Sequence, residues 1–157
     1  MTAEKKEVVI YTDGSCLNNP GTGGYAAVLS YKGHEREVSG GCLETTNNQM
    51  ELYACIAGLN KLKHPCVVDI YSDSQYVVKG ITLWIEGWIK NNWINGTIKN
   101  IQLWKDLKAA VDRHENVRWH WVKGHSTNAM NNRVDELARQ AAQAVEAGEM
   151  PPITVEA

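Results

Sequence analysis

The chain has 157 residues, a hydrophobic fraction of 43% and a formal net charge of −2 at pH 7. These values are typical of one globular domain, and they exclude a strongly basic protein whose whole surface attracts polyanions. The four cysteines form no CxxC pair and no zinc pattern with histidines, which indicates reduced thiols in a cytoplasmic protein. We expect neither a signal peptide nor a membrane span, because the first residues are charged and every apolar run is short.

The first predicted element is a β-strand within residues 8–15, where an unbroken apolar run leads to Asp13 and Gly14. Such a run is typical of a strand that is covered on both faces, so rigid backbone would hold Asp13 at its end. A turn-rich loop over 14–24 follows; it lacks the lysine and the following helix of a phosphate-binding P-loop. Strands over 25–31 and 35–43 complete a predicted antiparallel meander.

A helix is predicted over residues 46–63, ending before Pro65. Thr46 can accept a hydrogen bond from an early backbone amide, and Gln49 can reach back to the cap, which makes a capping box. Glu51 lies at the margin of the apolar stripe of this helix, so its side chain should point toward the sheet.

The next predicted strand, over residues 67–72, ends on a second acid, Asp73, and the strand–helix–strand order favours a parallel neighbour. A polar loop with His125 precedes the last helix, whose apolar stripe is bordered by Asp135. We expect one domain over residues 1–147 and a flexible tail over 148–157. The other predicted elements are helical turns over 76–92, a polar segment over 91–99, a helix over 101–111, a strand over 117–122 and a helix over 132–147.

Four acids occur at positions that are not on the expected solvent-exposed surface. Asp13 and Asp73 lie at the ends of predicted strands, and Glu51 and Asp135 border the apolar stripes of predicted helices. Ligands of open α/β sheets bind at the carboxyl ends of the strands. Two carboxylates about 4 Å apart repel by about 4 kcal/mol at an effective dielectric near 20, so such a cluster needs protons, separation or bound cations. Because oxygen ligands suit Mg²⁺ or Mn²⁺, we predict a divalent metal site that can cleave phosphodiesters.

Five groups of residues, in this order, resemble the motifs of bacterial type 1 ribonuclease H. They are TDGSC (12–16) with NPG (19–21) and GGY (23–25), TTNNQMEL (45–52), SDSQY (72–76), WVKGH (121–125) and DELAR (135–139). The resemblance covers about residues 7–147. It implies a single-domain α/β fold, in which a five-stranded mixed sheet (three antiparallel strands, then two parallel ones) is flanked by helices.

The same resemblance implies an endonuclease that cuts the RNA strand of RNA–DNA hybrids and leaves 5′-phosphate and 3′-hydroxyl ends. Asp13, Glu51, Asp73 and Asp135 would be catalytic acids that bind two Mg²⁺ ions, with Mn²⁺ as a substitute, and His125 would aid proton transfer or product departure. The resemblance also indicates substrate contacts, although each of these residues could instead be a turn, cap or packing residue: Cys16, Asn19, Thr46, Asn47, Asn48, Gln75, Trp84, Trp88 and Asn100.

The chain departs from the family pattern in its positive charges. The segment over residues 89–99 carries only Lys90 and Lys99, and Gln49 stands where arginine is common. We therefore expect weaker binding and a shallower salt dependence than in a lysine-rich relative. The loop over 126–132 also lacks the usual acid–asparagine pattern.

Two alternatives keep the same fold. One is an integrase- or transposase-like strand-transfer domain, which the lack of a DNA-binding extension disfavours. The other is a non-catalytic hybrid-binding module, which the four acids disfavour because they repel phosphate. Our preferred interpretation is a cytoplasmic monomer that needs no protein partner and binds the hybrid duplex.

Overall fold

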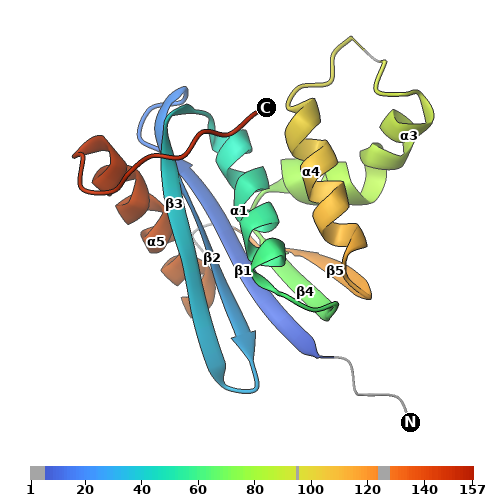
Figure 1. Cartoon of the computed structure of the whole chain (residues 1–157), viewed down its shortest axis with the longest axis horizontal. Helices are drawn as coiled ribbons and strands as arrows, with labels where there is room; N and C mark the ends of the chain where they lie inside the picture. Colours follow the sequence, from blue (N-terminus) through green and yellow to red (C-terminus); the bar gives the residue numbers. More distant parts are fainter. Residues whose placement is uncertain (1–5, 95, 124–127) are drawn as a thin grey trace.

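The computed structural model describes residues 6–94, 96–123 and 128–157. It contains five strands, five α-helices and one π-helical segment, η1, within these residues (Figure 1). In chain order they are β1 (Glu7–Cys16), β2 (Gly21–Tyr31), β3 (His34–Thr45), α1 (Asn47–Lys61), β4 (Val67–Ser72), α2 (Gln75–Lys79), η1 (Gly80–Trp84), α3 (Ile85–Lys90), α4 (Ile101–Asp112), β5 (Asn116–Trp121) and α5 (Ala129–Glu146).

The five strands form one sheet in the order β3-β2-β1-β4-β5. The pairs β1–β2 and β2–β3 are antiparallel, whereas β1–β4 and β4–β5 are parallel. This confirms the predicted mixed sheet and places β1 in its middle. The first strand is longer than expected, because it stays paired with β2 as far as Cys16 after its parallel pairing with β4 has ended at Thr12.

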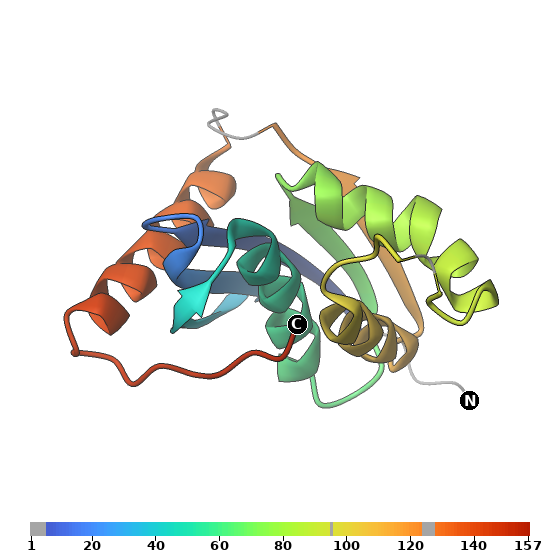
Figure 2. The ribbon, with the colours of Figure 1, turned by 90° about the horizontal axis from the view of Figure 1, so that it is seen from above.

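Helices cover both faces of the sheet (Figure 2). Helix α1 packs on β1 and β2 and is flanked by α4, while α5 packs on β1, β2 and β3 from the other side. The core between α1 and the sheet contains Ile10, Leu59 and Trp104, each fully buried. No helix in the described part of the chain has the length and apolar character needed to cross a membrane.

Several helix ends differ from the sequence-based expectation by a few residues. Helix α1 ends at Lys61 rather than Lys63, because Leu62 adopts an extended conformation. Helix α5 begins at Ala129, three residues early, because the side chain of Asn128 accepts hydrogen bonds from the amides of Met130 and Asn131 and caps the helix there.

The C-terminal segment 148–157, expected to be a flexible tail, lies against the domain. The amide of Ile153 donates a hydrogen bond of 2.8 Å to the carbonyl of Gly41 in β3. The side chains of Ile153 and Val155 pack against the buried cluster of Tyr25, Cys42 and Met50. These contacts argue against a wholly free tail, because Ile153 and Val155 place apolar side chains against buried residues of the domain.

Candidate active site

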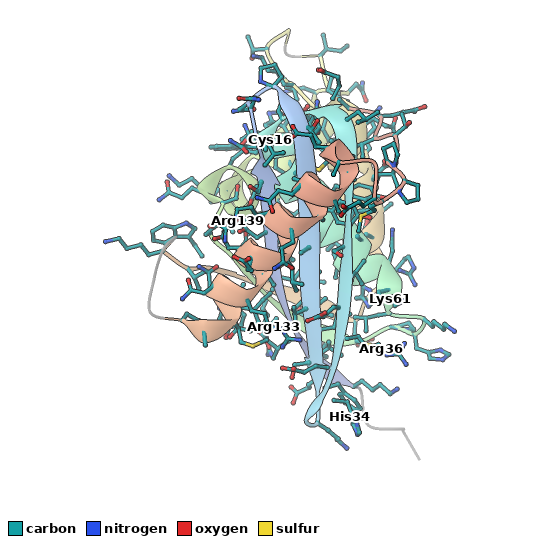
Figure 3. The ribbon with its side chains drawn as sticks, turned by 90° about the vertical axis from the view of Figure 1, so that its left-hand side faces the viewer. Cys16, His34, Arg36, Lys61, Arg133 and Arg139 are labelled. Atoms are coloured by element: carbon teal, nitrogen blue, oxygen red, sulfur yellow. The ribbon has the colours of Figure 1, made fainter. Side chains whose placement is uncertain are left out.

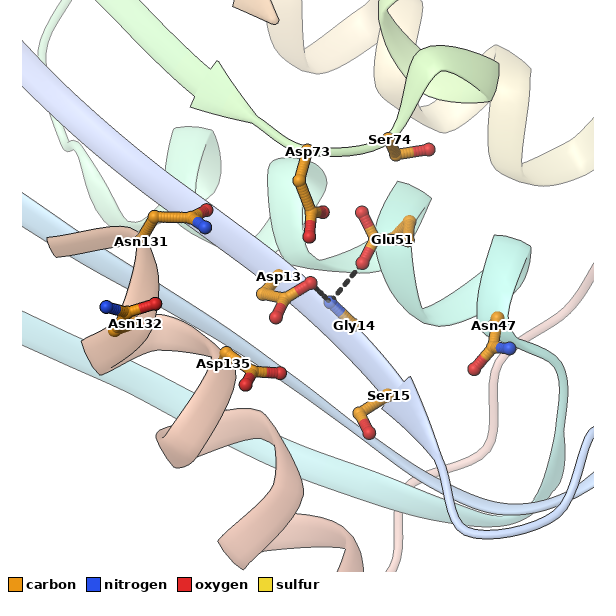
Figure 4. Close-up of a pocket in the computed structure, with 10 residues that line it drawn as sticks. All are labelled: Asp13, Gly14, Ser15, Asn47, Glu51, Asp73, Ser74, Asn131, Asn132 and Asp135. Carbon is orange, nitrogen blue, oxygen red and sulfur yellow. Dashed lines mark hydrogen bonds between the residues drawn. The ribbon is translucent and has the colours of Figure 1, made fainter. Parts of the chain in front are cut away.

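The four acids line one pocket of about 310 Å³ at the end of the sheet where β1 and β4 separate (Figure 4). Asp13 lies in β1, Asp73 directly follows β4, Glu51 comes from α1 and Asp135 from α5. Segments far apart in the sequence therefore converge, as the sequence predicted. The complete lining is Asp13, Gly14, Ser15, Asn47, Glu51, Asp73, Ser74, Asn131, Asn132 and Asp135.

Strand register positions the first two acids. The parallel ladder between β1 and β4 ends at the pair Thr12–Ser72, and the next residue on each strand is an acid, Asp13 or Asp73. Because the strands are parallel and in register, both carboxylates leave the sheet at the same edge. Asp13 is 4% exposed, whereas Asp73 is only partly buried.

A close backbone contact brings Glu51 to Asp13. A Cβ atom at Gly14 would lie 2.4 Å from the amide nitrogen of Glu51, so only glycine lets α1 approach β1 here. The Gly14 amide then donates hydrogen bonds to both acids, at 2.9 Å to Oδ1 of Asp13 and 2.5 Å to Oε1 of Glu51. One backbone group thus orients two carboxylates, as Figure 4 shows.

The seating of α5 on β2 determines the position of Asp135. A Cβ atom at Gly24 would lie 2.2 Å from the carbonyl oxygen of Ala138, so this glycine lets the helix backbone approach the strand. Gly24 pairs with Ser15, two residues beyond Asp13 on the same face of β1. Asp135, one turn before Ala138, therefore reaches the pocket, with Nη1 of Arg139 3.6 Å from its carboxylate.

The acids repel one another and lie mostly out of water. Burial, together with repulsion from Asp73, raises the pKa of Asp13 to about 7, although the Glu51 carboxyl partly offsets this. Burial first, then the neighbouring Asp13, raises the pKa of Glu51 well above its usual value, and burial likewise raises the pKa of Asp73. Among the described residues, no cation forms an ion pair with any of these three acids.

The site fits a divalent metal ion. One carboxylate oxygen from each of Asp13, Glu51 and Asp73 lies within 4.8 Å of the others. In addition, Oε2 of Glu51 is buried and has no hydrogen-bond partner in the described structure. An unpartnered buried carboxylate oxygen is costly unless a cation or proton meets it. The donor set contains only oxygen, which suits Mg²⁺ or Mn²⁺ rather than zinc.

The residues predicted to contact substrate on the β1 side form a connected rim. The Cys16 amide donates to Oδ1 of Asn47 at 2.9 Å, and the Asn47 amide donates to Oδ1 of Asn19 at 3.1 Å. The turn after β1 is thereby tied to the first residue of α1. Asn47 also lines the acidic pocket, and Gln75 is exposed at the start of α2, just beyond Ser74.

Half of the predicted capping box is present. Oγ1 of Thr46 accepts a hydrogen bond from the Gln49 amide at 3.1 Å, as expected. The Gln49 side chain does not reach back to the cap; its Nε2 donates to Oδ1 of Asn100, and its Oε1 accepts from Thr45. The reason is that Asn100, in a left-handed conformation before α4, presents an acceptor 3.1 Å away.

A second groove of about 200 Å³ contains the other predicted contacts: Asn48, Trp84, Trp88 and Asn100. The two tryptophans differ in their surroundings. Trp84 is 41% exposed, whereas Trp88 is half-buried and packs against the rings of Trp93 and Trp104. Packing within the domain therefore accounts for Trp88, while Trp84, whose ring centroid lies 6.1 Å from that of Trp88, keeps a large exposed fraction beside the groove.

Sequence reasoning did not assign five residues that line the pocket: Gly14, Ser15, Ser74, Asn131 and Asn132. Ser15 and Ser74 follow the strand acids closely, and Asn131 precedes Asp135 by one helical turn, so their spacing was a usable signal. Asn131 is 3% exposed, which is unusual for a side-chain amide on the first turn of a helix. The predicted His125 lies outside the described residues.

Comparison with known proteins agrees with this geometry. The family model described as RNase H matches residues 5–143. A ribonuclease H of Bartonella tribocorum is 54% identical over 155 residues, which cover 96% of this chain and 99% of that protein.

Two solved structures resemble this fold. The structure of LC9-RNase H1, described as a type 1 RNase H with the type 2 active-site motif, has 32% identity and a TM-score of 0.82, covering 92% of this chain and 75% of that one. LC11-RNase H1, solved in complex with an RNA/DNA hybrid, is 23% identical with a TM-score of 0.71 over 88% of this chain and 99% of that one, a likeness that shows the fold alone. The chain belongs to the ribonuclease H family, whose enzymes cleave the RNA strand of RNA–DNA hybrids.

Proposed function

We propose that Asp13, Glu51, Asp73 and Asp135 hold two Mg²⁺ ions, and that this ribonuclease H uses them to hydrolyse the RNA strand with 5′-phosphate and 3′-hydroxyl products. The observation that carries the proposal is the cluster of three carboxylate oxygens within 4.8 Å of one another, one from each of β1, α1 and the end of β4. When bound, such ions polarise the scissile phosphate and activate water. Mn²⁺, with similar ligand preferences, is expected to substitute.

The chain's own groups prepare the site for cations. The Gly14 amide fixes the orientation of Asp13 and Glu51, so little rotamer freedom remains to be lost on binding. Asp135 enters from the opposite face of the sheet on α5, and its partly exposed carboxylate can adjust to the substrate. We assign His125 a role in proton transfer or product departure, since a histidine titrates near neutral pH.

Recognition of the hybrid is proposed to use two regions on either side of α1. The amide side chains of Asn19, Asn47 and Gln75 can both donate to and accept from a 2′-hydroxyl, the group that distinguishes RNA from DNA. Cys16 is tied to the same rim through its backbone amide.

The groove of Asn48, Trp84 and Asn100 would take the DNA strand, and Thr46, the N-cap of α1, would add a phosphate contact. Because Oγ1 of Thr46 accepts from the Gln49 amide, its hydroxyl hydrogen remains to donate to a phosphate. The cap and the phosphate contact are therefore compatible. We further propose a cytoplasmic monomer that needs no protein partner for cleavage.

The decisive experiment compares the parent protein with Asp13→Asn on a labelled RNA–DNA hybrid, with Mg²⁺, with Mn²⁺ and with chelator. The parent should cleave the RNA strand only with metal and leave duplex RNA and duplex DNA intact. Asp13→Asn should remain folded and bind hybrid without measurable cleavage. Cleavage by Asp13→Asn at the parental rate would disprove the role of Asp13. Joining of DNA ends, or binding without turnover in Mg²⁺, would favour the strand-transfer or binding-module alternative.

A further inference from the structure

A chain of side-chain hydrogen bonds runs beside the groove that contains Trp84 and Asn100. Oγ1 of Thr45 donates to Oε1 of Gln49 at 2.9 Å, and Nε2 of Gln49 donates to Oδ1 of Asn100 at 3.1 Å. Nδ2 of Asn100 then donates to the hydroxyl oxygen of Tyr76 at 3.2 Å. The hydrogen-bond chain therefore links the end of β3, the first turn of α1, the residue before α4, and α2.

This hydrogen-bond chain ends at an oxygen that receives two donors. Nε1 of the fully buried Trp104 also lies 3.2 Å from the hydroxyl oxygen of Tyr76. An indole N–H can only donate, and the side-chain amide nitrogen of Asn100 likewise can only donate. The Tyr76 oxygen therefore accepts twice, and its own hydrogen needs an acceptor elsewhere. In the described part of the chain the hydroxyl has no third hydrogen-bond partner.

The Tyr76 side chain borders the groove. It is half-buried and lines the groove together with Asn48 and Asn100. Its ring packs on that of Trp104, with the ring centroids 5.2 Å apart, so the position of the hydroxyl is fixed by packing as well as by two hydrogen bonds. Because both acceptor directions of the oxygen are used within the protein, the hydroxyl hydrogen remains for a ligand in the groove.

The lining of the groove suits an anion that is held mainly by neutral donors. Among the described lining residues Lys99 is the one cation, and no carboxylate occurs. Figure 3 shows Arg133 and Arg139 on α5, which covers the opposite face of the sheet, and both pair with carboxylates there. Phosphate oxygens only accept hydrogen bonds, so they match the Tyr76 hydroxyl, the second hydrogen on Nδ2 of Asn100 and the ammonium group of Lys99.

We propose that the Tyr76 hydroxyl donates a hydrogen bond to a phosphate of the DNA strand, and that Gln49 is the positioning residue that keeps this donor available. Nε2 of Gln49 occupies Oδ1 of Asn100, so the Asn100 amide cannot turn that oxygen toward Tyr76. Thr45, which is 4% exposed, fixes the orientation of the Gln49 amide in turn. This inference rests on the proposed function, which assigns the groove to the DNA strand.

Removal of the Gln49 donor should act through Tyr76. The Asn100 amide could then turn over and accept from the Tyr76 hydroxyl, which would consume the hydrogen meant for phosphate. Neither Gln49 nor Tyr76 lines the pocket of the four acids. A phosphate held in the groove is bound equally in the ground state and in the transition state. Loss of this contact should therefore raise KM and leave kcat unchanged.

The first measurement is steady-state cleavage of a labelled hybrid by the full chain with Mg²⁺. Tyr76→Phe should raise KM about three- to tenfold and leave kcat within about twofold. Gln49→Met, which keeps the length of the side chain but removes the donor, should raise KM at least about threefold. The double variant should not exceed Tyr76→Phe, because both changes remove one contact. Tyr31→Phe removes a hydroxyl outside the groove and should leave KM and kcat within about twofold.

The second measurement locates the phosphate. A set of hybrids carries one neutral methylphosphonate each in the DNA strand, and one position should raise the KM of the parent most. At that position Tyr76→Phe should raise KM by less than about twofold further, whereas at the other positions it should have its full effect. Urea unfolding shows whether each variant is folded. If Tyr76→Phe does not fold, Gln49→Met, which retains the Tyr76 ring and hydroxyl, is tested on the same set of hybrids.

The possible failures separate this contact from the proposed function. A parental KM in folded Tyr76→Phe, or its full effect at the sensitive position, would overturn the Tyr76 contact alone. Additive effects of Gln49→Met and Tyr76→Phe would overturn the positioning role of Gln49. If no methylphosphonate in the DNA strand raised the KM of the parent, the assignment of the groove to that strand would fail, and the Tyr76 contact with it.

Discussion

Replacing Asp13 by asparagine should stabilise the metal-free protein at pH 8 but not near pH 4. Burial raises the pKa of Asp13 from 3.8 to about 7 in the folded state. An acid with a raised folded pKa is protonated more readily in the folded than in the unfolded chain. Its contribution to stability therefore falls as the pH rises from about 4 to about 7, and the full penalty remains above that range.

The size of the effect follows from the same values. At about 1.4 kcal/mol for each pKa unit, a pKa raised from 3.8 to about 7 corresponds to roughly 4 kcal/mol of destabilisation at pH 8. Solvent screening reduces this little, because the side chain is 4% exposed. Asparagine keeps an oxygen that can accept from the Gly14 amide, so the hydrogen bond need not be lost. We expect Asp13→Asn to gain about 2–4 kcal/mol at pH 8, since Glu51 shares part of the repulsion.

Urea unfolding in chelator at pH 4.5, 6 and 8 measures this effect. The difference in unfolding free energy between Asp13→Asn and parent should grow with pH and flatten above about pH 7. Asp106→Asn removes an exposed carboxylate on α4 and should stay within about 0.5 kcal/mol of the parent at each pH. Parallel pH profiles for parent and Asp13→Asn would refute the reasoning. Saturating Mg²⁺ should narrow the gap by stabilising the parent more.

Three other predictions concern the close contact at Gly14, the C-terminal segment and the lysine-poor segment 89–99. Gly14→Ala should lower the free energy of unfolding in urea by about 1–3 kcal/mol, because its Cβ would displace Glu51. The same substitution should lower the cleavage rate much more than hybrid binding, and cleavage at the parental rate would contradict this. Truncation after residue 147 should lower the free energy of unfolding by about 1–2 kcal/mol in the same assay, because the packing of Ile153 and Val155 is lost. An unchanged urea midpoint would show that residues 148–157 are a flexible tail after all. Hybrid binding should lose about one unit of log–log salt slope for each phosphate contact absent relative to a lysine-rich relative, and equal slopes in parallel titrations would rule this out.

The positions of the acids could be predicted because they follow from periodicity. Asp13 and Asp73 end apolar runs, and parallel pairing of those runs brings them to one edge. Glu51 lies at the margin of the apolar stripe of its helix, which predicts that its side chain points toward the sheet. Each inference needed only the repeat of a strand or helix and one topological rule. The same argument placed Asp135, although α5 begins three residues earlier than expected.

Features that depend on tertiary partners could not be predicted. The side chain of Gln49 was expected to reach back to the cap of its own helix, yet its Nε2 donates to Asn100, which lies 51 residues away in sequence. Likewise, the stretch after residue 147 looked loose from its glycine and prolines, but Ile153 meets β3 at Gly41.

The four acids differ in how firmly the fold holds them, which bears on how cations would be bound. Asp13 and Glu51 accept hydrogen bonds from one backbone amide, and Asp73 is the residue after the last parallel pair of β1 and β4. These three acids are therefore held by the sheet and α1. Asp135 depends instead on the seating of α5 over Gly24 and has an arginine within 3.6 Å. A cation enclosed by the first three would find its ligands preorganised. A second cation that relies on Asp135 would bind more weakly until substrate phosphate supplies further oxygen ligands, since both ligand count and rigidity determine affinity for such ions.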